Sequence, residues 1–163
     1  MIRVAIITSS DSGYAGIRED VSGPVIREIV MKEGYQVVEE LLLPDELEQL
    51  KEAMSKIADE NKADLILTTG GTGFSMRDCM PEATHAIADR MVPGIPEAMR
   101  FYSMQFTKRA MLSRAAAGIR KETLIVNLPG SPKAVRECLE FIISELTHGV
   151  EILVGSAKDC ARK

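Results

Sequence analysis

Three glycines and three threonines follow an apolar run in Leu65-Ile66-Leu67-Thr68-Thr69-Gly70-Gly71-Thr72-Gly73. This pattern predicts a buried strand that ends in a loop of exposed backbone N–H groups and hydroxyls. Glycine permits φ > 0 and lets a ligand come close to the main chain, and successive N–H groups that face one concavity bind phosphate. The loop has neither the ending of a P-loop nor the spacing of a dinucleotide fingerprint. By itself it is equally consistent with a ligand site and a tight turn.

Two aspartates in predicted loops, Asp45 and Asp78, could supply acidic groups to the same site. Carboxylate oxygens hold hard cations such as Mg²⁺, so these residues beside a phosphate-binding loop suit phosphoryl or nucleotidyl transfer. Structural roles are the alternatives: Asp45 as a helix N-cap with Glu48 as its partner, Asp78 as an acceptor for the amides of Cys79–Glu82, and Arg77 as a solvated loop residue. Neither histidine lies in these loops, which disfavours covalent acyl chemistry.

Alternating apolar runs and amphipathic patterns predict the elements that must position these residues. The predicted strands are Ile2–Thr8, Val37–Leu43, Asp64–Thr69, Ala115–Arg120 and Thr123–Leu128. The predicted helices begin at Ser22 with Pro24, at Asp45, at Pro81, at Pro96, and at Ser131 with Pro132, and the last of them ends at Gly149. The alternation indicates a single three-layer α/β domain over residues 1–155, with a mostly parallel central sheet and helices on both faces. Residues 156–163 are expected to form a polar, frayed tail.

Four polar segments are expected to meet at one edge of that sheet. They are Ser9–Gly13, Pro44-Asp45, Thr69–Asp78 and Asn127–Lys133. Ligands of such sheets bind beyond the carboxyl ends of the strands. This convergence supports a functional site more strongly than any one motif does.

Composition disfavours several classes of protein. A net charge of −4 and an aromatic content of 4% without tryptophan argue against nucleic acid as a partner, which would require basic and stacking side chains. All apolar runs are shorter than the roughly 20 residues of a membrane span, so no membrane partner is expected. Three widely spaced cysteines, Cys79, Cys138 and Cys160, indicate reduced thiols and a cytoplasmic protein. Met1 leads directly into strand-like residues, so no secretory signal is expected.

Several short motifs along the chain match one known family. They are Thr69-Gly70-Gly71-Thr72-Gly73, Arg77-Asp78, Pro81-Glu82-Ala83-Thr84, Pro93-Gly94 with Glu97 and Arg100, Leu112-Ser113-Arg114, and Asn127-Leu128-Pro129-Gly130-Ser131-Pro132-Lys133. In this combination the chain resembles the MogA/MoaB molybdopterin-binding family, from Val4 to about Gly155. Ile119-Arg120-Lys121 with Leu124-Ile125-Val126-Asn127 is most similar to the MogA branch.

The resemblance implies a molybdopterin adenylyltransferase, which transfers AMP from MgATP to the terminal phosphate of molybdopterin and releases pyrophosphate. It also implies a homo-oligomer, either a trimer or the hexamer of the MoaB branch, and a molybdenum-insertion enzyme downstream. One alternative is a non-catalytic molybdopterin-binding or scaffold protein of the same family. A second is an unrelated nucleotide or sugar-phosphate enzyme on the same fold. The presence of both Asp45 and Asp78 favours the adenylyltransferase.

By family position, Asp45 and Asp78 are assigned to catalysis and to Mg²⁺. Substrate binding is assigned to Thr69, Gly70, Gly71, Thr72, Gly73, Ser75 and Arg77. Nucleotide binding is assigned to Asp11, Ser12, Pro129, Gly130 and Ser131. Arg114 and Lys133 are expected to offset phosphate charge.

The chain departs from the family pattern directly after Asp78, where Cys79-Met80-Pro81 replaces Val-Thr-Pro. With Pro81 as the first helical residue, Met80 occupies the N-cap and offers no side-chain oxygen. The helix is therefore expected to lack a hydroxyl cap, a loss of about 0.5–2 kcal/mol. Cys79 is expected to act as a small buried hydrophobe in place of valine rather than as a ligand.

Overall fold

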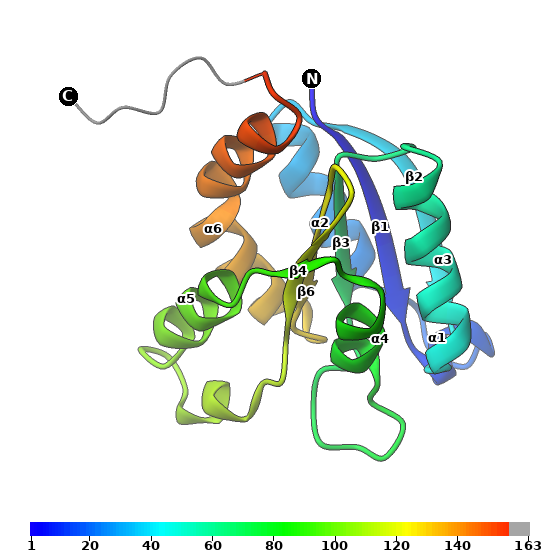
Figure 1. Cartoon of the computed structure of the whole chain (residues 1–163). Helices are drawn as coiled ribbons and strands as arrows, with labels where there is room; N and C mark the ends of the chain where they lie inside the picture. The colour runs from blue at the N-terminus through cyan, green and yellow to red at the C-terminus, as the bar shows by residue number, and fades with distance from the viewer. Residues whose placement is uncertain (157–163) are drawn as a thin grey trace.

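A six-stranded mixed sheet forms the centre of this computed structural model, which describes residues 1–156 (Figure 1). The strands are β1 (Arg3–Ser9), β2 (Gln36–Leu43), β3 (Leu65–Thr69), β4 (Arg90–Met91), β5 (Ala117–Arg120) and β6 (Thr123–Leu128). Their order is β2-β1-β3-β6-β5-β4. The first four in this order run parallel, whereas β5 and β4 pair antiparallel with their neighbours. The predicted, mostly parallel sheet is confirmed.

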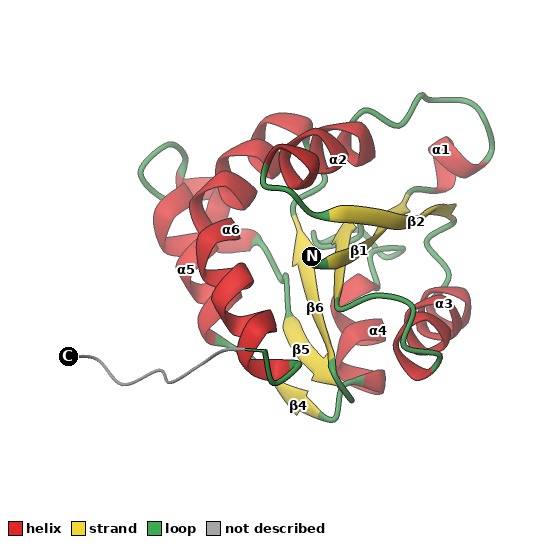
Figure 2. Ribbon diagram, turned by 90° about the horizontal axis from the view of Figure 1, so that it is seen from above, coloured by secondary structure: helices red, strands yellow, loops and turns green. Residues whose placement is uncertain are grey.

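Helices cover both faces of the sheet, as predicted. They are α1 (Asp11–Tyr14), α2 (Ser22–Lys32), α3 (Leu47–Asp59), α4 (Met80–Ile87), α5 (Gly94–Ser103) and α6 (Pro132–Leu153), with a 3₁₀ turn at Lys108–Leu112. Figure 2 shows α2, α5 and α6 on one side of the sheet and α3 and α4 on the other. Among residues 1–156, no helix has the length and apolar character needed to cross a membrane.

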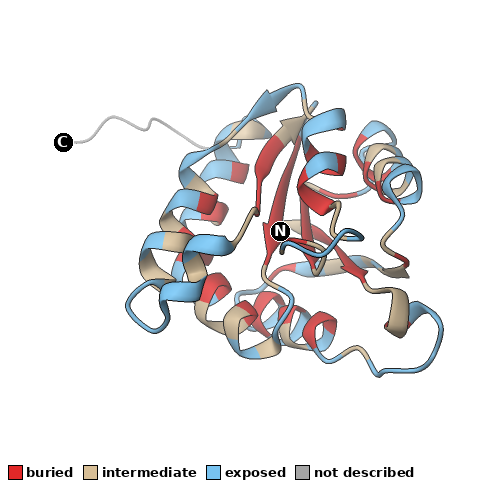
Figure 3. Ribbon diagram, turned by 90° about the horizontal axis from the view of Figure 1, so that it is seen from below, coloured by how far each residue is buried: buried red, intermediate tan, exposed pale blue. Residues whose placement is uncertain are grey.

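Alternating side chains of the central strands fill two separate cores. In β1, Val4 and Ile6 pack toward α2 and α6, whereas Ala5 and Ile7 pack toward α3 and α4. All four are at most 2% exposed, because successive side chains of a strand point to opposite faces and both faces are covered here. In Figure 3 the central strands β1, β3 and β6 are correspondingly buried, whereas the outer strands β2 and β4 are partly or fully exposed, as are the outer sides of the helices. Because helices cover both faces of the sheet, the ends of its strands are the part that remains open to a ligand.

Four predicted helix boundaries differ from the structure, three of them in α3, α5 and α6. Asp45 is not the N-cap of α3: Glu46 has that position, without a side-chain cap, because the Asp45 carboxylate accepts from Ser9 and Asp11 instead. Gly149 does not end α6, which continues to Leu153 because burial of Val150 extends its apolar face. The helix predicted at Pro96 begins at Gly94.

The start of α4 is uncapped, as predicted, but is displaced by one residue. Met80 is the first helical residue and Cys79 the N-cap, with no side-chain hydrogen bond. The Met80 N–H instead donates to the Gly71 carbonyl oxygen at 3.1 Å, and its side chain is fully buried. Cys79 packs against the core beneath α3 and α4, as expected of a small hydrophobe, and burial raises the pKa of its thiol. Of the predicted tail, residues 157–163, with Cys160, lie outside the described residues.

Candidate active site

The loops that follow β1, β2, β3 and β6 surround a polar cavity of about 420 Å³, which we call the site cavity. It is lined by Thr8, Ser9, Ser10, Gly13, Arg18, Glu19, Asp20, Val21, Ser22, Asp45, Thr69, Gly70, Gly71, Asp78, Gly130, Ser131 and Pro132. A larger cavity of about 530 Å³ between α5, α6 and β5 has a largely apolar lining and shares no residue with it. Of these two cavities, only the site cavity lies at the carboxyl ends of the parallel strands, where such sheets bind ligands.

The glycine loop forms one wall of the site cavity with its backbone. Gly70 has φ +89° and Gly71 φ +66°, values that side chains other than glycine rarely adopt. A Cβ on Gly70 would lie 2.2 Å from the Ser9 carbonyl oxygen. The loop can therefore take this path only with glycine at position 70.

Arg114 holds the far side of the glycine loop. Its Nε donates to the Gly73 carbonyl oxygen at 2.7 Å, and its Nη2 donates to the Asp78 carbonyl oxygen at 3.0 Å. Its backbone N–H donates to the Thr72 carbonyl oxygen at 2.9 Å, and its Nη1 pairs with Glu82. The expectation that Arg114 offsets phosphate charge does not fit these contacts, because its guanidinium is already occupied by groups of the protein.

Asp45 and Asp78 line the same cavity, each held by a different loop. Asp45 Oδ1 accepts from the Ser9 hydroxyl at 2.5 Å, and Asp78 Oδ2 accepts from the Ser75 N–H at 2.9 Å. A Cβ on Gly73 would lie 2.9 Å from Asp78 Oδ2, and one on Gly71 would lie 3.4 Å from Asp45 Oδ1. The glycines thus make room for both carboxylates as well as for the bend of the chain.

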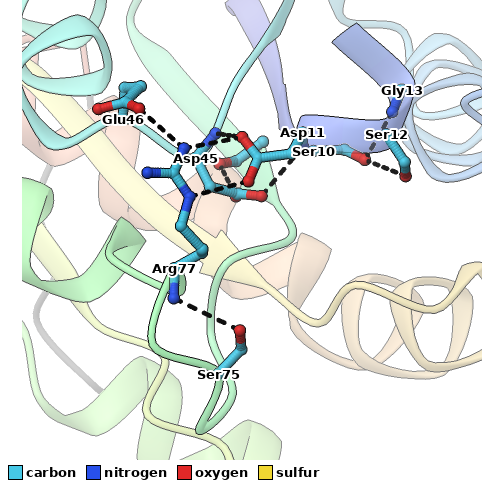
Figure 4. Close-up of polar contacts among 9 residues, drawn as sticks. Ser10, Asp11, Ser12, Gly13, Asp45, Glu46, Ser75 and Arg77 are labelled. Atoms are coloured by element: carbon cyan, nitrogen blue, oxygen red, sulfur yellow. Dashed lines mark hydrogen bonds and ion pairs between the residues drawn. The ribbon is translucent and has the colours of Figure 1, made fainter. Parts of the chain in front are cut away.

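A network of polar contacts joins Asp45 to the loop after β1 (Figure 4). The N–H of Asp11 donates to Asp45 Oδ2 at 3.0 Å, and the N–H of Asp45 donates to Asp11 Oδ1 at 2.9 Å. Arg77 donates to both oxygens of the same Asp11 carboxylate, at 2.9 and 3.0 Å, and to Glu46 at 2.8 Å. Hydrogen bonds from Arg77 and from the Asp45 backbone lower the pKa of Asp11.

The loop after β6 closes the cavity on the side of α2 and α6. Thr69 Oγ1 donates to the Pro129 carbonyl oxygen at 2.6 Å, and Ser22 Oγ donates to the Gly130 carbonyl oxygen at 2.8 Å. The Ser131 hydroxyl accepts from the Ala134 N–H at 3.2 Å, so it caps α6 as predicted. Lys133 points to solvent, with its side chain 87% exposed and Glu137 4.0 Å away.

The site cavity also contains residues that were not predicted. Asp20 accepts from the N–H groups of Ser22 and Gly23 at 3.0 and 3.1 Å and from Thr8 Oγ1 at 2.7 Å. An acidic residue shortly before Ser-Gly-Pro is a recognisable helix-start signal, so Asp20 could have been found from the sequence. Arg18 is the one basic residue lining this cavity within residues 1–156, and no motif marks it.

The residues assigned by family position divide into three groups. Asp45, Asp78, Thr69, Gly70, Gly71, Gly130 and Ser131 line the site cavity. Thr72, Gly73 and Pro129 line an adjoining cavity of about 290 Å³ beside α5 and α6. Asp11 and Ser12 in α1, and Ser75 and Arg77 in the loop before α4, line neither cavity.

The oxygen atoms that line the site cavity could serve as ligands of a hard divalent cation that is also bound by the phosphates of a substrate. Among residues 1–156, no group of three or more acidic, histidine or cysteine side chains is arranged to hold a metal alone. Mg²⁺ commonly takes one or two carboxylates and completes its shell with waters and substrate phosphates. Asp45 and Asp78 supply carboxylate oxygens, and Ser9 and Thr69 supply hydroxyls in the same cavity.

Comparison with known proteins places the chain in a family. Residues 5–148 match the model of a probable molybdopterin binding domain. The chain belongs to the molybdopterin-binding family. The resemblance inferred from its motifs is therefore confirmed.

Members of the molybdopterin-binding family match the chain over most of its length. A molybdopterin adenylyltransferase of Helicobacter pylori is 39% identical over 157 residues, which cover 95% of this chain and 89% of the relative. One of Haemophilus influenzae is 41% identical over 143 residues, which cover 86% and 72%. The crystal structure of the molybdopterin biosynthesis enzyme MoaB from Thermus thermophilus has 45% identity and a TM-score of 0.90, covering 95% of this chain and 98% of that one.

Proposed function

We propose that the protein is a molybdopterin adenylyltransferase, which transfers AMP from ATP to the terminal phosphate of molybdopterin and releases pyrophosphate. The observation that carries the proposal is the site cavity, in which a phosphate-binding type of glycine loop and the two carboxylates of Asp45 and Asp78 meet. The names of relatives at 39–41% identity support the same reaction.

Charge in the site cavity supports Mg²⁺ as the partner of ATP. The cavity is lined by four acidic residues, Glu19, Asp20, Asp45 and Asp78. Within residues 1–156, its one basic lining residue is Arg18. Two polyanionic substrates would be repelled by such a surface unless a cation came with them. We assign the cation to Asp45 and Asp78. When bound, Mg²⁺ would neutralise charge on the phosphate oxygens.

The chain's own groups would act by positioning. Amides of Gly70 and Gly71 and the hydroxyl-bearing loop at Gly130-Ser131 would orient the phosphates. An anionic oxygen of the molybdopterin phosphate would form a bond to the α-phosphorus of ATP, while the bond to the bridging oxygen breaks and pyrophosphate leaves with its electron pair. The second pKa of a phosphomonoester is about 6, so its attacking oxygen is already deprotonated at neutral pH and needs no general base. Neither His85 nor His148 lines the site cavity, which agrees with catalysis by orientation and electrostatics.

Further assignments rest on the family resemblance. We propose that Thr72, Gly73 and Ser75 contact molybdopterin, and that Ser12 and Pro129 contact the nucleotide. We also propose a cytoplasmic homo-oligomer, trimer or hexamer, whose product passes to a molybdenum-insertion enzyme. Exposed apolar side chains near α5 support association of copies: Phe101, Met104, Phe106, Met111 and Leu112 are 39–76% exposed.

Release of pyrophosphate tests the proposed reaction. The purified protein is incubated with molybdopterin and MgATP, and pyrophosphate and adenylylated molybdopterin are quantified. We expect product only when both substrates and Mg²⁺ are present. Binding of molybdopterin without pyrophosphate would instead support the non-catalytic scaffold. Absence of molybdopterin binding would contradict both functions.

A further inference from the structure

Arg77 lies on the exposed loop between β3 and α4, yet its guanidinium contacts a residue 66 positions away in sequence. Nε and Nη2 donate to the two carboxylate oxygens of Asp11 at 2.9 and 3.0 Å. A paired contact of this kind fixes both direction and distance, which a single hydrogen bond does not. The loop tip beside it is open to solvent, with Phe74 71% and Met76 100% exposed. Arg77 therefore connects a solvent-exposed loop to the start of α1, just beyond the end of β1.

Asp11 passes this constraint to Asp45. The backbone N–H of each aspartate donates to the carboxylate of the other, at 2.9 and 3.0 Å. Two carboxylates this close in space would repel each other if both faced the cavity unpaired. Arg77 neutralises one of them, and Asp11 does not line the site cavity, whereas Asp45 does. Of these two aspartates, Asp45 is therefore the one whose charge faces the site cavity.

We propose that Arg77 is a positioning residue of adenylyl transfer that acts on Asp45 through Asp11. This inference rests on the proposed function and replaces the direct substrate and nucleotide contacts that the resemblance implies for Arg77 and Asp11. Arg77 keeps the Asp11 carboxylate turned toward the Asp45 backbone, and the Asp11 N–H in turn holds Asp45 Oδ2. The other oxygen, Oδ1, is held by Ser9 at 2.5 Å. Both oxygens of Asp45 thus have a set direction before any ligand binds.

Arg77→Gln tests this role because it removes the charge and the paired donors. We expect kcat for pyrophosphate release to fall about tenfold or more, as when groups that orient a metal-binding carboxylate are lost. KM for ATP and for molybdopterin should stay within about threefold, because a positioning residue contributes little to ground-state binding. Arg77→Lys should recover only part of the rate, since an ammonium cannot form the paired contact.

Glu46→Gln is the matched control. It removes the other partner of the same guanidinium, at 2.8 Å and with similar exposure, but leaves the Asp11 contact intact. Because exposed ion pairs contribute little, we expect kcat within about twofold of the unmodified protein. The double variant Asp11→Asn with Arg77→Gln should lose no more rate than the more damaging single change, because both act along one path.

Amide hydrogen exchange of the ligand-free protein supplies a readout that does not depend on turnover. The N–H groups of Asp11 and Asp45 should exchange faster in Arg77→Gln and unchanged in Glu46→Gln. An increased KM with unchanged kcat would identify Arg77 as a direct ligand and overturn the inference, as would a lower kcat with unchanged exchange at both amides. If the unmodified protein released no pyrophosphate, the proposed function would fail first, and exchange would still show whether Arg77 orders Asp45.

Discussion

Gly70 at the end of β3 contacts the carbonyl oxygen of Ser9 at the end of β1 so closely that a Cβ would lie 2.2 Å from that oxygen. The contact brings the glycine loop against the strand end that also supplies the hydroxyl bound to Asp45. Backbone approach between adjacent strand ends therefore sets the shape of the site cavity. The absence of a side chain at this position is as much a part of the site as its carboxylates are.

Gly70→Ala should destabilise the protein by about 2 kcal/mol or more, since the side chain adds a backbone clash to an unfavourable positive φ. Gly34→Ala is the matched control: Gly34 has φ +84°, but a Cβ added there would meet no atom within 4 Å, so a loss near about 1 kcal/mol is expected. Urea unfolding of both variants measures the difference. Equal losses would show that the contact with Ser9 relaxes without cost.

Asp45→Asn and Asp78→Asn should each lower the rate of pyrophosphate release by about 10²-fold, because each removes an electrostatic stabiliser while keeping the side-chain shape. Molybdopterin binding should survive in both. Glu122→Gln, at an exposed acidic residue outside the site cavity, controls for loss of negative charge. A steady-state rate within about twofold of the unmodified protein for either aspartate variant would exclude that residue from the mechanism.

Arg18→Gln should weaken ATP binding by about tenfold, the order expected for loss of a charged hydrogen bond. The effect on AMP should be smaller because AMP carries less phosphate charge. Calorimetric titration of both nucleotides in the presence of Mg²⁺ measures this, and Arg90→Gln on the exposed edge strand β4 is the control. If ATP and AMP are weakened equally, Arg18 does not interact with the β- and γ-phosphates.

Asp59→Asn should reduce stability at neutral pH but not in strong acid. Hydrogen bonds from Arg120 and Lys121 lower the pKa of Asp59 from 3.8 to about 2. A carboxyl whose pKa is lowered in the native state contributes fully to stability at pH values above its unfolded-state pKa. This contribution is lost as the pH falls through its native-state pKa. Denaturant midpoints of the variant and the unmodified protein should therefore converge between about pH 4 and pH 2. A constant difference across that interval would show that the ion pair is not its cause.

The central elements could be predicted because their signals are local. Buried strands such as β3 and β6 are continuous apolar runs, and α6 begins with a Ser-Pro pair that is explicit in the sequence. The elements that were missed are short: α1 has 4 residues and β4 has 2. Periods of hydrophobicity cannot be recognised over such lengths.

Residues that line the site cavity could be predicted where a loop directly follows a strand, but their hydrogen-bond partners could not. Asp45 has the spacing of a helix cap, yet contacts across 34 and 36 positions in the sequence determine its role. Asn127 likewise lies fully buried within β6, where its side-chain amide donates to Thr68 and Thr84 at 3.1 and 2.8 Å. Contacts of this kind depend on which strands become neighbours, and this information is not present in any short segment.

The outer strands of the sheet, β2 and β4, affect how copies of this chain could associate. Strand β4 has only 2 residues, and β2 carries Glu39 and Glu40 in succession, the second paired with Arg27. Short or charged outer strands disfavour the addition of a foreign strand, because pairing would strip water from the charges. Assembly by extension of the sheet is therefore disfavoured, and so is aggregation through its outer strands. Copies of the chain would instead associate through the surfaces of their helices.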